Sequence, residues 1–283
     1  MRGTMDAPLR TTAGTAHGMA SGLVALALVL SMSGCASTTP AATSGAGSGT
    51  ASAPIEFDVS AASSLKSVLT SSAAAFEQAN NVKLTFNFGA SGLLVRQIEG
   101  DAPADVFLSA SPAAVTTLAV EGLASSESSA TFAGNTLVVL VPKGDPAGIH
   151  GPSDLARAGK LTTGDPAVAP HGQKAVEWLT GLGMWDALQP KFVFAANAAQ
   201  TDDYVARGEV DAGIGFASDA HGRTDIEVAY TVPDGRIKPI TYVAVPLTAT
   251  KQTALAKAYI AYLLSADVQQ SFTDSGFKPA PAK

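Results

Sequence analysis

Four turns in this sequence combine small residues, serines and free backbone amides in a pattern that could hold an anion. They are residues 59–65, 88–93, 164–172 and 195–199. Each turn follows a predicted strand and precedes a predicted helix, so each helix start offers unpaired N–H groups and the positive end of a helix dipole. Several helix starts that converge can bind an anion without lysine or arginine. These turns are therefore the candidate ligand site.

Each turn taken alone has a simpler structural explanation. Ser64 could cap the first helix, a role that serine often fills. Ser91 and Gly92 could form a cap and a tight turn. Four turns of one kind, in a chain whose N-terminus resembles an export signal (described below), favour anion binding over four independent caps.

Other kinds of chemistry find little support in the sequence. It contains no G-x-G-x-x-G, Walker or G-x-S-x-G motif, so neither a nucleotide cofactor nor a serine nucleophile is indicated. His150, His171 and His221 are far apart and lack neighbouring ligands at metal-binding spacing. We expect no cofactor, no directly coordinated metal and no enzymatic activity. An enzyme on a similar scaffold is the alternative, and it would need a nucleophile or an acid/base pair that these turns do not supply.

The charge balance excludes one class of partner. Lys+Arg number 18 against Asp+Glu 24, which gives a formal net charge of −6. A nucleic-acid-binding protein needs a basic surface that neutralises phosphates. Nucleic acid is therefore not an expected partner.

The elements that must position the four turns are short strands alternating with amphipathic helices. This alternation predicts an α/β fold of βαβ units with mainly parallel sheets and flanking helices. Nine strands exceed what one small sheet usually holds, so we expect two lobes joined by a two-segment hinge. The predicted strands are residues 55–60, 83–88, 104–108, 137–141, 160–163, 192–194, 212–216, 226–232 and 241–245. The predicted lobes are residues 54–136 with 240–283 (lobe I) and residues 137–239 (lobe II).

The N-terminus reads as an export signal. Arg2 and Arg10 precede the apolar residues 19–32, a segment shorter than the roughly 20 residues that span a membrane. Small residues then lead to Cys35, the only cysteine, in a sequence that resembles a bacterial lipobox. We predict a signal peptide at residues 1–34, lipidation of Cys35 and a flexible tether at residues 35–53. The alternative is an ordinary signal peptide, cleaved near Ala36 with loss of Cys35.

Beyond the signal, the chain resembles the molybdate-binding component of ABC importers from about residue 55 to residue 277. The most specific match is residues 96–107, RQIEGDAPADVF. The other matching segments are residues 61–69, 88–95, 108–110, 134–144, 161–175, 213–220 and 275–278. The resemblance implies a type II periplasmic-binding-protein fold. It also implies a monomer, held at the outer face of the cell membrane by its lipid, that passes molybdate or tungstate to an importer permease.

The resemblance also implies which residues hold the oxyanion. The two serine positions of the family fall on Ser64 and Ser91, and two backbone amide positions fall on His171 and Ala198. A tyrosine position of the family falls on Phe216, which has no hydroxyl. Either the site works with fewer donors, or another group fills the gap, such as the imidazole of His171 or the hydroxyl of Tyr204. This departure keeps sulfate, phosphate and organic anions open as alternative ligands.

Overall fold

The structure is a computed structural model that describes residues 53–280. The predicted signal peptide and Cys35 lie outside the described residues. Within residues 53–280, no helix is long and apolar enough to cross a membrane.

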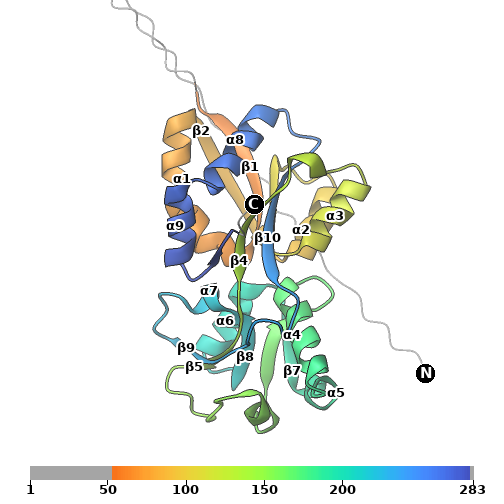
Figure 1. Ribbon diagram of the computed structural model, residues 1–283, viewed down its shortest axis with the longest axis vertical. Coiled ribbons are helices and arrows are strands. Elements are labelled where there is room, and N and C mark those ends of the chain that lie inside the picture. Colours follow the sequence, from red (N-terminus) through yellow and green to blue (C-terminus); the bar gives the residue numbers. More distant parts are fainter. Residues whose placement is uncertain (1–52, 281–283) are drawn as a thin grey trace, which may run out of the picture. The chain divides into compact units, whose positions relative to one another are not determined.

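The first sheet has six strands in the order β11-β4-β10-β3-β1-β2, with helices packed around it (Figure 1). Its strands are β1 (Ile55–Ala62), β2 (Val82–Gly89), β3 (Val106–Ser109), β4 (Ala130–Asn135), β10 (Ile240–Pro246) and β11 (Lys278–Pro279). Its helices are η1 (Ser63–Leu65), α1 (Lys66–Asn80), α2 (Ser91–Glu99), α3 (Pro112–Val120), η2 (Ser126–Ser128), α8 (Thr253–Leu263) and α9 (Ala266–Asp274).

The second sheet has five strands in the order β7-β6-β8-β5-β9. Its strands are β5 (Leu137–Pro142), β6 (Leu161–Gly164), β7 (Phe192–Ala195), β8 (Ala212–Phe216) and β9 (Ile226–Thr231). Its helices are η3 (Pro152–Ala156), α4 (Pro170–Gly181), α5 (Trp185–Leu188), η4 (Gln189–Lys191), α6 (Ala198–Ala206) and α7 (Ala217–Ala220).

The α/β prediction is confirmed, but both sheets are mixed rather than mainly parallel. The pairs β1–β2, β1–β3, β6–β7 and β6–β8 are parallel, as βαβ units require. The pairs that involve β4, β5, β9 and β10 are antiparallel. These strands enter or leave the two crossings between the sheets, so they run against the βαβ strands beside them.

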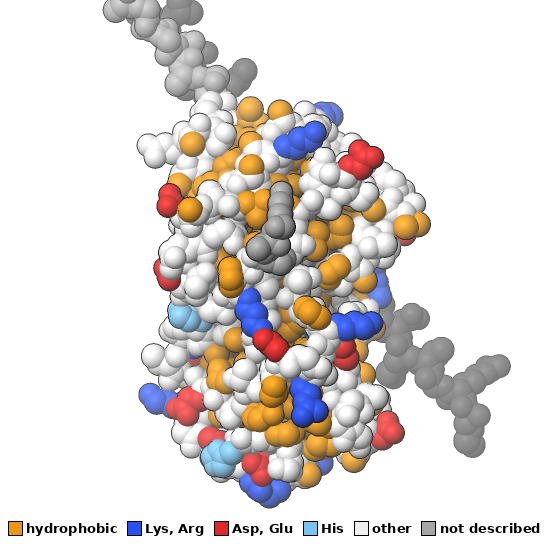
Figure 2. All heavy atoms as spheres, viewed as in Figure 1, with side chains coloured by type: hydrophobic (Ala, Val, Ile, Leu, Met, Phe, Trp, Pro, Cys, Tyr) orange, Lys and Arg blue, Asp and Glu red, His pale blue; other side chains and the backbone are white. Residues whose placement is uncertain are grey.

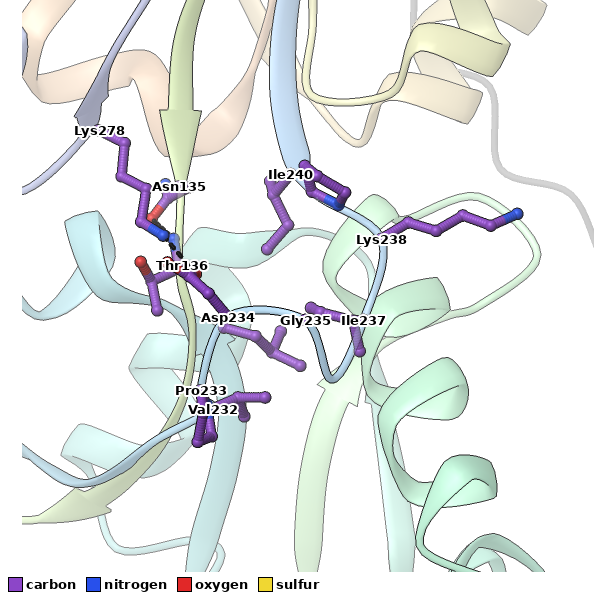
Figure 3. Close-up of a pocket in the computed structure, with 12 residues that line it drawn as sticks. Asn135, Thr136, Val232, Pro233, Asp234, Gly235, Ile237, Lys238, Ile240 and Lys278 are labelled. Carbon is purple, nitrogen blue, oxygen red and sulfur yellow. Dashed lines mark hydrogen bonds and ion pairs between the residues drawn. The ribbon is translucent and has the colours of Figure 1, made fainter. Parts of the chain in front are cut away.

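Two segments cross between the sheets. Thr136 alone separates β4 from β5, and residues 232–239 connect β9 to β10. Beside the crossings lies a cavity of about 310 Å³, where Lys278 forms an ion pair with Asp234 (Figure 3). The proposed lobe boundaries, residues 54–136 with 240–283 and residues 137–239, give each lobe one of the two sheets, and we use them below.

The sequence pattern found nine of the strands but missed β4 and β11. Several inner strands are buried along their length, as in β5, where all six residues are buried. β4 contains small residues and ends in Asn135, so its hydrophobic signal is weak. β11 has only two residues, which is too short for any periodicity.

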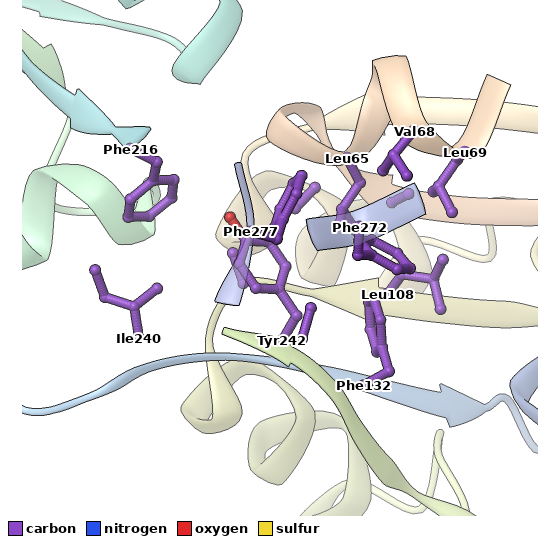
Figure 4. Close-up of a cluster of buried hydrophobic side chains, with 14 of the residues drawn as sticks. Leu65, Val68, Leu69, Leu108, Phe132, Phe216, Ile240, Tyr242, Phe272 and Phe277 are labelled. Carbon is purple, nitrogen blue, oxygen red and sulfur yellow. The ribbon is translucent and has the colours of Figure 1, made fainter. Parts of the chain in front are cut away.

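The largest hydrophobic core runs through both sheets. In lobe I the rings of Phe132, Phe272 and Phe277 pack around Leu65 and Tyr242 (Figure 4). Phe216, at the end of β8, packs against Tyr242 with ring centroids 6.3 Å apart. On the face of the described residues in Figure 2, charged side chains of both signs are interspersed.

Candidate functional site

The two lobes contact each other at the four turns that the sequence singles out. The N–H of Gly92, at the start of α2, donates to the carbonyl of Val168 in the turn before α4, at 2.9 Å. The N–H of Ala198, at the start of α6, donates to Oγ of Ser63 in η1, at 3.1 Å. Each hydrogen bond joins one turn of lobe I to one turn of lobe II. The helix starts of the two lobes therefore face each other in two pairs, and the N–H groups of Gly92 and Ala198 are used in the contact itself.

Neither predicted ligand serine is a helix cap. The residue before α1 is Leu65 and the residue before α2 is Ala90, and neither helix start has a side-chain cap. By contrast, Asn197 does cap α6 by accepting a hydrogen bond from the N–H of Gln200 at 3.1 Å. The structural explanation that the sequence left open for Ser64 and Ser91 is therefore absent from this fold.

The hydroxyls at this junction accept hydrogen bonds from fixed backbone donors. Ser91 is fully buried, and its Oγ accepts from the N–H of Ala110 at 3.1 Å. The Oγ of Ser63 accepts from Ala198 in the same way. A hydroxyl whose oxygen accepts from an N–H keeps its own hydrogen available for donation. Both serines are thus prepared to donate to an oxyanion.

Ser64 has a side-chain partner instead. Its Oγ lies 2.8 Å from the hydroxyl of Tyr242 on β10. Burial raises the pKa of Tyr242 above its ordinary value, so the phenol stays protonated and neutral. Tyr242 therefore places a second hydroxyl beside Ser64. The sequence analysis did not name its strand, β10, as part of the site.

His171 is suited to act through its backbone and not through its ring. Burial lowers the pKa of its imidazole to about 4, so the ring carries no charge at neutral pH. Nε2 lies 3.0 Å from Oγ1 of Thr201, which is fully buried inside lobe II. Gly164 makes room for the ring, since a Cβ there would lie 2.3 Å from Cε1 of His171. The backbone N–H of His171 lies in the first turn of α4, where N–H groups have no partner within the helix.

Phe216 is in contact with a predicted ligand residue, His171, but its side chain has no hydrogen-bond donor. Its ring is buried and contacts the rings of His171, at a centroid distance of 5.7 Å, and of Tyr242. Tyr204, the other hydroxyl considered for the gap, lines a different pocket with Lys160 and Glu209. Of the hydroxyls near Phe216, that of Tyr242 is the one in contact with a predicted ligand serine.

A cavity of about 560 Å³ opens between the lobes beside these hydroxyls. Ser63 and Ser64 line it from lobe I, while Asp202 and Asp219 line it from lobe II. Lys66, His221 and Arg223 also line it. The charges of Lys66 and Arg223 can draw an anion toward the junction, although two carboxyl groups line the same cavity.

Two carboxyl groups lie together on the lobe II side of this cavity. A Cβ on Gly215 would lie 3.8 Å from Oδ1 of Asp202 and 3.8 Å from Oδ2 of Asp219. Among residues 53–280, Oδ1 of Asp202 is buried without a hydrogen-bond partner, whereas Oδ2 of Asp219 accepts from the N–H of Phe216 at 3.1 Å. Burial first, and then the charge of Asp219, raises the pKa of Asp202 above its ordinary value. The pair therefore holds a proton under conditions where separate carboxyls would be ionised.

Of the five predicted site residues, Ser64, Ser91, His171, Ala198 and Phe216, Ser64 is the one that lines the cavity of about 560 Å³. The N–H of Ala198 donates to Ser63 across the junction, and Phe216 contacts His171 and Tyr242. The sequence analysis did not single out Ser63, Tyr242 or the carboxyl pair. Ser63 is adjacent to a chosen serine, so its turn was the available signal. Tyr242 lies within a predicted strand, where neither composition nor alternation reveals which hydroxyl faces the other lobe.

Two sheets, two crossings and a cavity between facing helix starts define a solute-binding protein. The chain belongs to the family of bacterial extracellular solute-binding proteins, whose model matches residues 57–278. It is 32% identical over 228 residues to the Escherichia coli molybdate-binding protein ModA, covering 77% of this chain and 87% of that protein. It is 29% identical over 256 residues to Bacillus subtilis YvgL, named as an ABC transporter substrate-binding lipoprotein, covering 90% and 96%.

A solved structure shares the fold. The periplasmic molybdate-binding protein of Azotobacter vinelandii matches with a TM-score of 0.72 and 24% identity, covering 80% of this chain and 100% of that one. The two-lobed fold class that the sequence predicted is thereby confirmed.

Proposed function

We propose that this protein captures a tetrahedral oxyanion, molybdate or tungstate, outside the cytoplasm and delivers it to an ABC importer. The observation that carries the proposal is the meeting of four helix starts with hydroxyls whose oxygens already accept hydrogen bonds. Such hydroxyls and amides offer hydrogens to a ligand, while the carboxyl groups of Asp202 and Asp219 line the same cavity. The names of the relatives, molybdate-binding proteins and an ABC transporter component, support the same conclusion.

Neutral donors suit a carrier that must also release its cargo. Fixed N–H and O–H dipoles bind an anion with little reorganisation, because the fold has already oriented them. A buried full counter-charge would hold the anion more tightly than transport allows. Selectivity between sulfate and the larger molybdate and tungstate then depends on the size of the closed site.

The protein acts by binding, without a cofactor and without catalysis. A hydroxyl–imidazole pair near the site, Thr201 with His171, is buried inside lobe II, and Thr201 has no exposed surface. A nucleophile must reach its substrate, so this pair does not serve as one.

Removing either predicted ligand hydroxyl tests the site. We expect Ser64→Ala and Ser91→Ala each to weaken molybdate binding by about 1.5–3 kcal/mol, roughly tenfold or more in affinity. Ser91→Ala also removes the acceptor of the buried N–H of Ala110, so its melting temperature should fall, and the affinity is the quantity that decides the role of each serine. Calorimetric titration with molybdate, tungstate, sulfate and phosphate measures both the effect and the selectivity.

Two results would contradict the proposal. One is a wild type that binds none of the four oxyanions. The other is a pair of variants with lowered melting temperatures and unchanged affinities, because that is the behaviour of structural serines. Ser126→Ala, at the start of η2 in lobe I, serves as a control that should change neither quantity.

The membrane anchor is tested at Cys35. We propose that Cys35 is lipidated and that residues 35–53 tether the binding protein to the outer face of the membrane, in agreement with the name of the B. subtilis relative. Cys35→Ser should abolish acyl labelling and move the protein from the membrane to the soluble fraction. A variant that stays membrane-bound and acylated would refute the anchor and leave the binding proposal untouched.

A further inference from the structure

A chain of hydrogen bonds connects both crossing strands to Ser64. Asn135, the last residue of β4, is buried, and its Nδ2 lies 2.8 Å from Oγ of Ser218 and 3.1 Å from the hydroxyl oxygen of Tyr242. The hydroxyl of Tyr242 in turn lies 2.8 Å from Oγ of Ser64. The chain thus starts at one crossing strand, passes through the other and ends at a predicted ligand residue.

The direction of each bond follows from Asn135. Its Oδ1 accepts the N–H of Thr136 at 2.8 Å, which fixes the orientation of the amide and makes Nδ2 the donor on the other side. The oxygen of Tyr242 therefore accepts from Asn135. The single hydrogen of the phenol is left to point at Ser64.

Ser64 then has its own hydrogen free for a ligand. Its oxygen accepts from Tyr242, so its own hydrogen must find another acceptor. Ser64 lines the cavity between the lobes, where such an acceptor would be a bound anion. Without Tyr242 the hydroxyl of Ser64 could rotate and turn its hydrogen away from a ligand.

We propose that Tyr242 and Asn135 are positioning residues that orient the hydroxyl of Ser64 so that it donates a hydrogen bond to the oxyanion. In this inference, which rests on the proposed function, the hydroxyl that completes the site comes from β10 and acts through Ser64. Phe216 can therefore lack a hydroxyl without leaving Ser64 unoriented. The phenol serves as a donor over the whole physiological pH range because burial keeps it protonated.

The chain also favours oxyanions that carry no hydrogen. Molybdate, tungstate and sulfate are acceptors only at neutral pH, whereas hydrogen phosphate must also donate its own proton. A serine hydroxyl whose hydrogen is turned toward the ligand pairs less well with that proton than with an unprotonated oxygen, which costs affinity. Loss of Tyr242 should therefore reduce the preference for molybdate over phosphate.

A double-mutant cycle tests the inference. Tyr242→Phe keeps the ring and removes the hydroxyl, and we expect it to raise the Kd for molybdate about tenfold. In a Ser64→Ala background the same change should alter the Kd by less than about twofold, because Tyr242 acts through the hydroxyl that is already absent. Asn135→Ala breaks the chain one step earlier and should show the same dependence on Ser64.

Controls separate orientation from folding. Tyr259→Phe removes the hydroxyl of another buried tyrosine in lobe I and should leave the Kd unchanged. Equal effects of Tyr242→Phe with and without Ser64 would overturn the inference, as would an unchanged ratio of molybdate to phosphate affinity. A wild type that does not bind molybdate would instead refute the proposed function, so the two failures are distinguishable.

Discussion

Gly92→Ala should weaken molybdate binding roughly ten- to a hundredfold without lowering the stability of the fold. A Cβ at this position would lie 2.8 Å from the carbonyl oxygen and 2.9 Å from Cα of Val168, which belong to the other lobe. Both are backbone atoms and cannot turn aside as a flexible side chain would. The lobes would have to move apart, and the helix starts would then no longer converge on the anion.

Stability and affinity should separate in this variant. Gly92 lies in the first turn of α2, where alanine is a better helix former than glycine by about 0.5–1 kcal/mol. The melting temperature without ligand should therefore stay the same or rise. Because contact between the lobes retains the anion, most of the loss should appear as faster dissociation, measured by stopped-flow competition.

Gly181→Ala is the matched control for Gly92→Ala. Gly181 is the last residue of α4, and a Cβ there would have no other atom within 4 Å. Its affinity should equal that of the wild type. If Gly92→Ala also binds molybdate like the wild type, the contact between Gly92 and Val168 does not form in the ligand-bound protein.

The sequence predicted the elements better than it predicted how they combine. Apolar strands such as β5 and β8 can be predicted from their composition. The predicted bounds of β8 agree with the observed ones, Ala212–Phe216. The direction of β10 beside β3 depends on where the chain crosses between lobes, which no local pattern encodes. This is why a mainly parallel sheet was expected where the structure has mixed ones.

The same limit applies to the site. Ser64 and Ser91 could be proposed because serine at a helix start has few roles, and anion binding is one of them. Tyr242 is separated from Ser64 by 178 positions, and their contact exists only because β10 enters the first sheet from the second crossing. The carboxyls of Asp202 and Asp219 likewise come from α6 and α7 and meet only behind Gly215.

That carboxyl pair makes stability depend on pH in an uncommon direction. Burial raises the pKa of Asp202 and of Asp219 above their ordinary value of 3.8. The native state therefore keeps protons that the unfolded chain has already released. Unfolding releases them, so the free energy of unfolding falls as pH rises from the ordinary carboxyl range through the raised pKa values. The slope is at most about 1.4 kcal/mol per pH unit for each proton.

Asp202→Asn should lower by one the number of protons released on unfolding. The variant should therefore be more stable than the wild type at alkaline pH. The amide of asparagine has nearly the shape of the protonated carboxyl, and it cannot ionise. The advantage of the variant over the wild type should grow from about pH 5 to about pH 9, by up to about 1.4 kcal/mol per unit. Urea denaturation at each pH measures it. Asp186→Asn, at an exposed position of α5, should run parallel to the wild type. If the curves of Asp202→Asn and the wild type also run parallel, Asp202 is ionised in the native state and the pair does not share a proton.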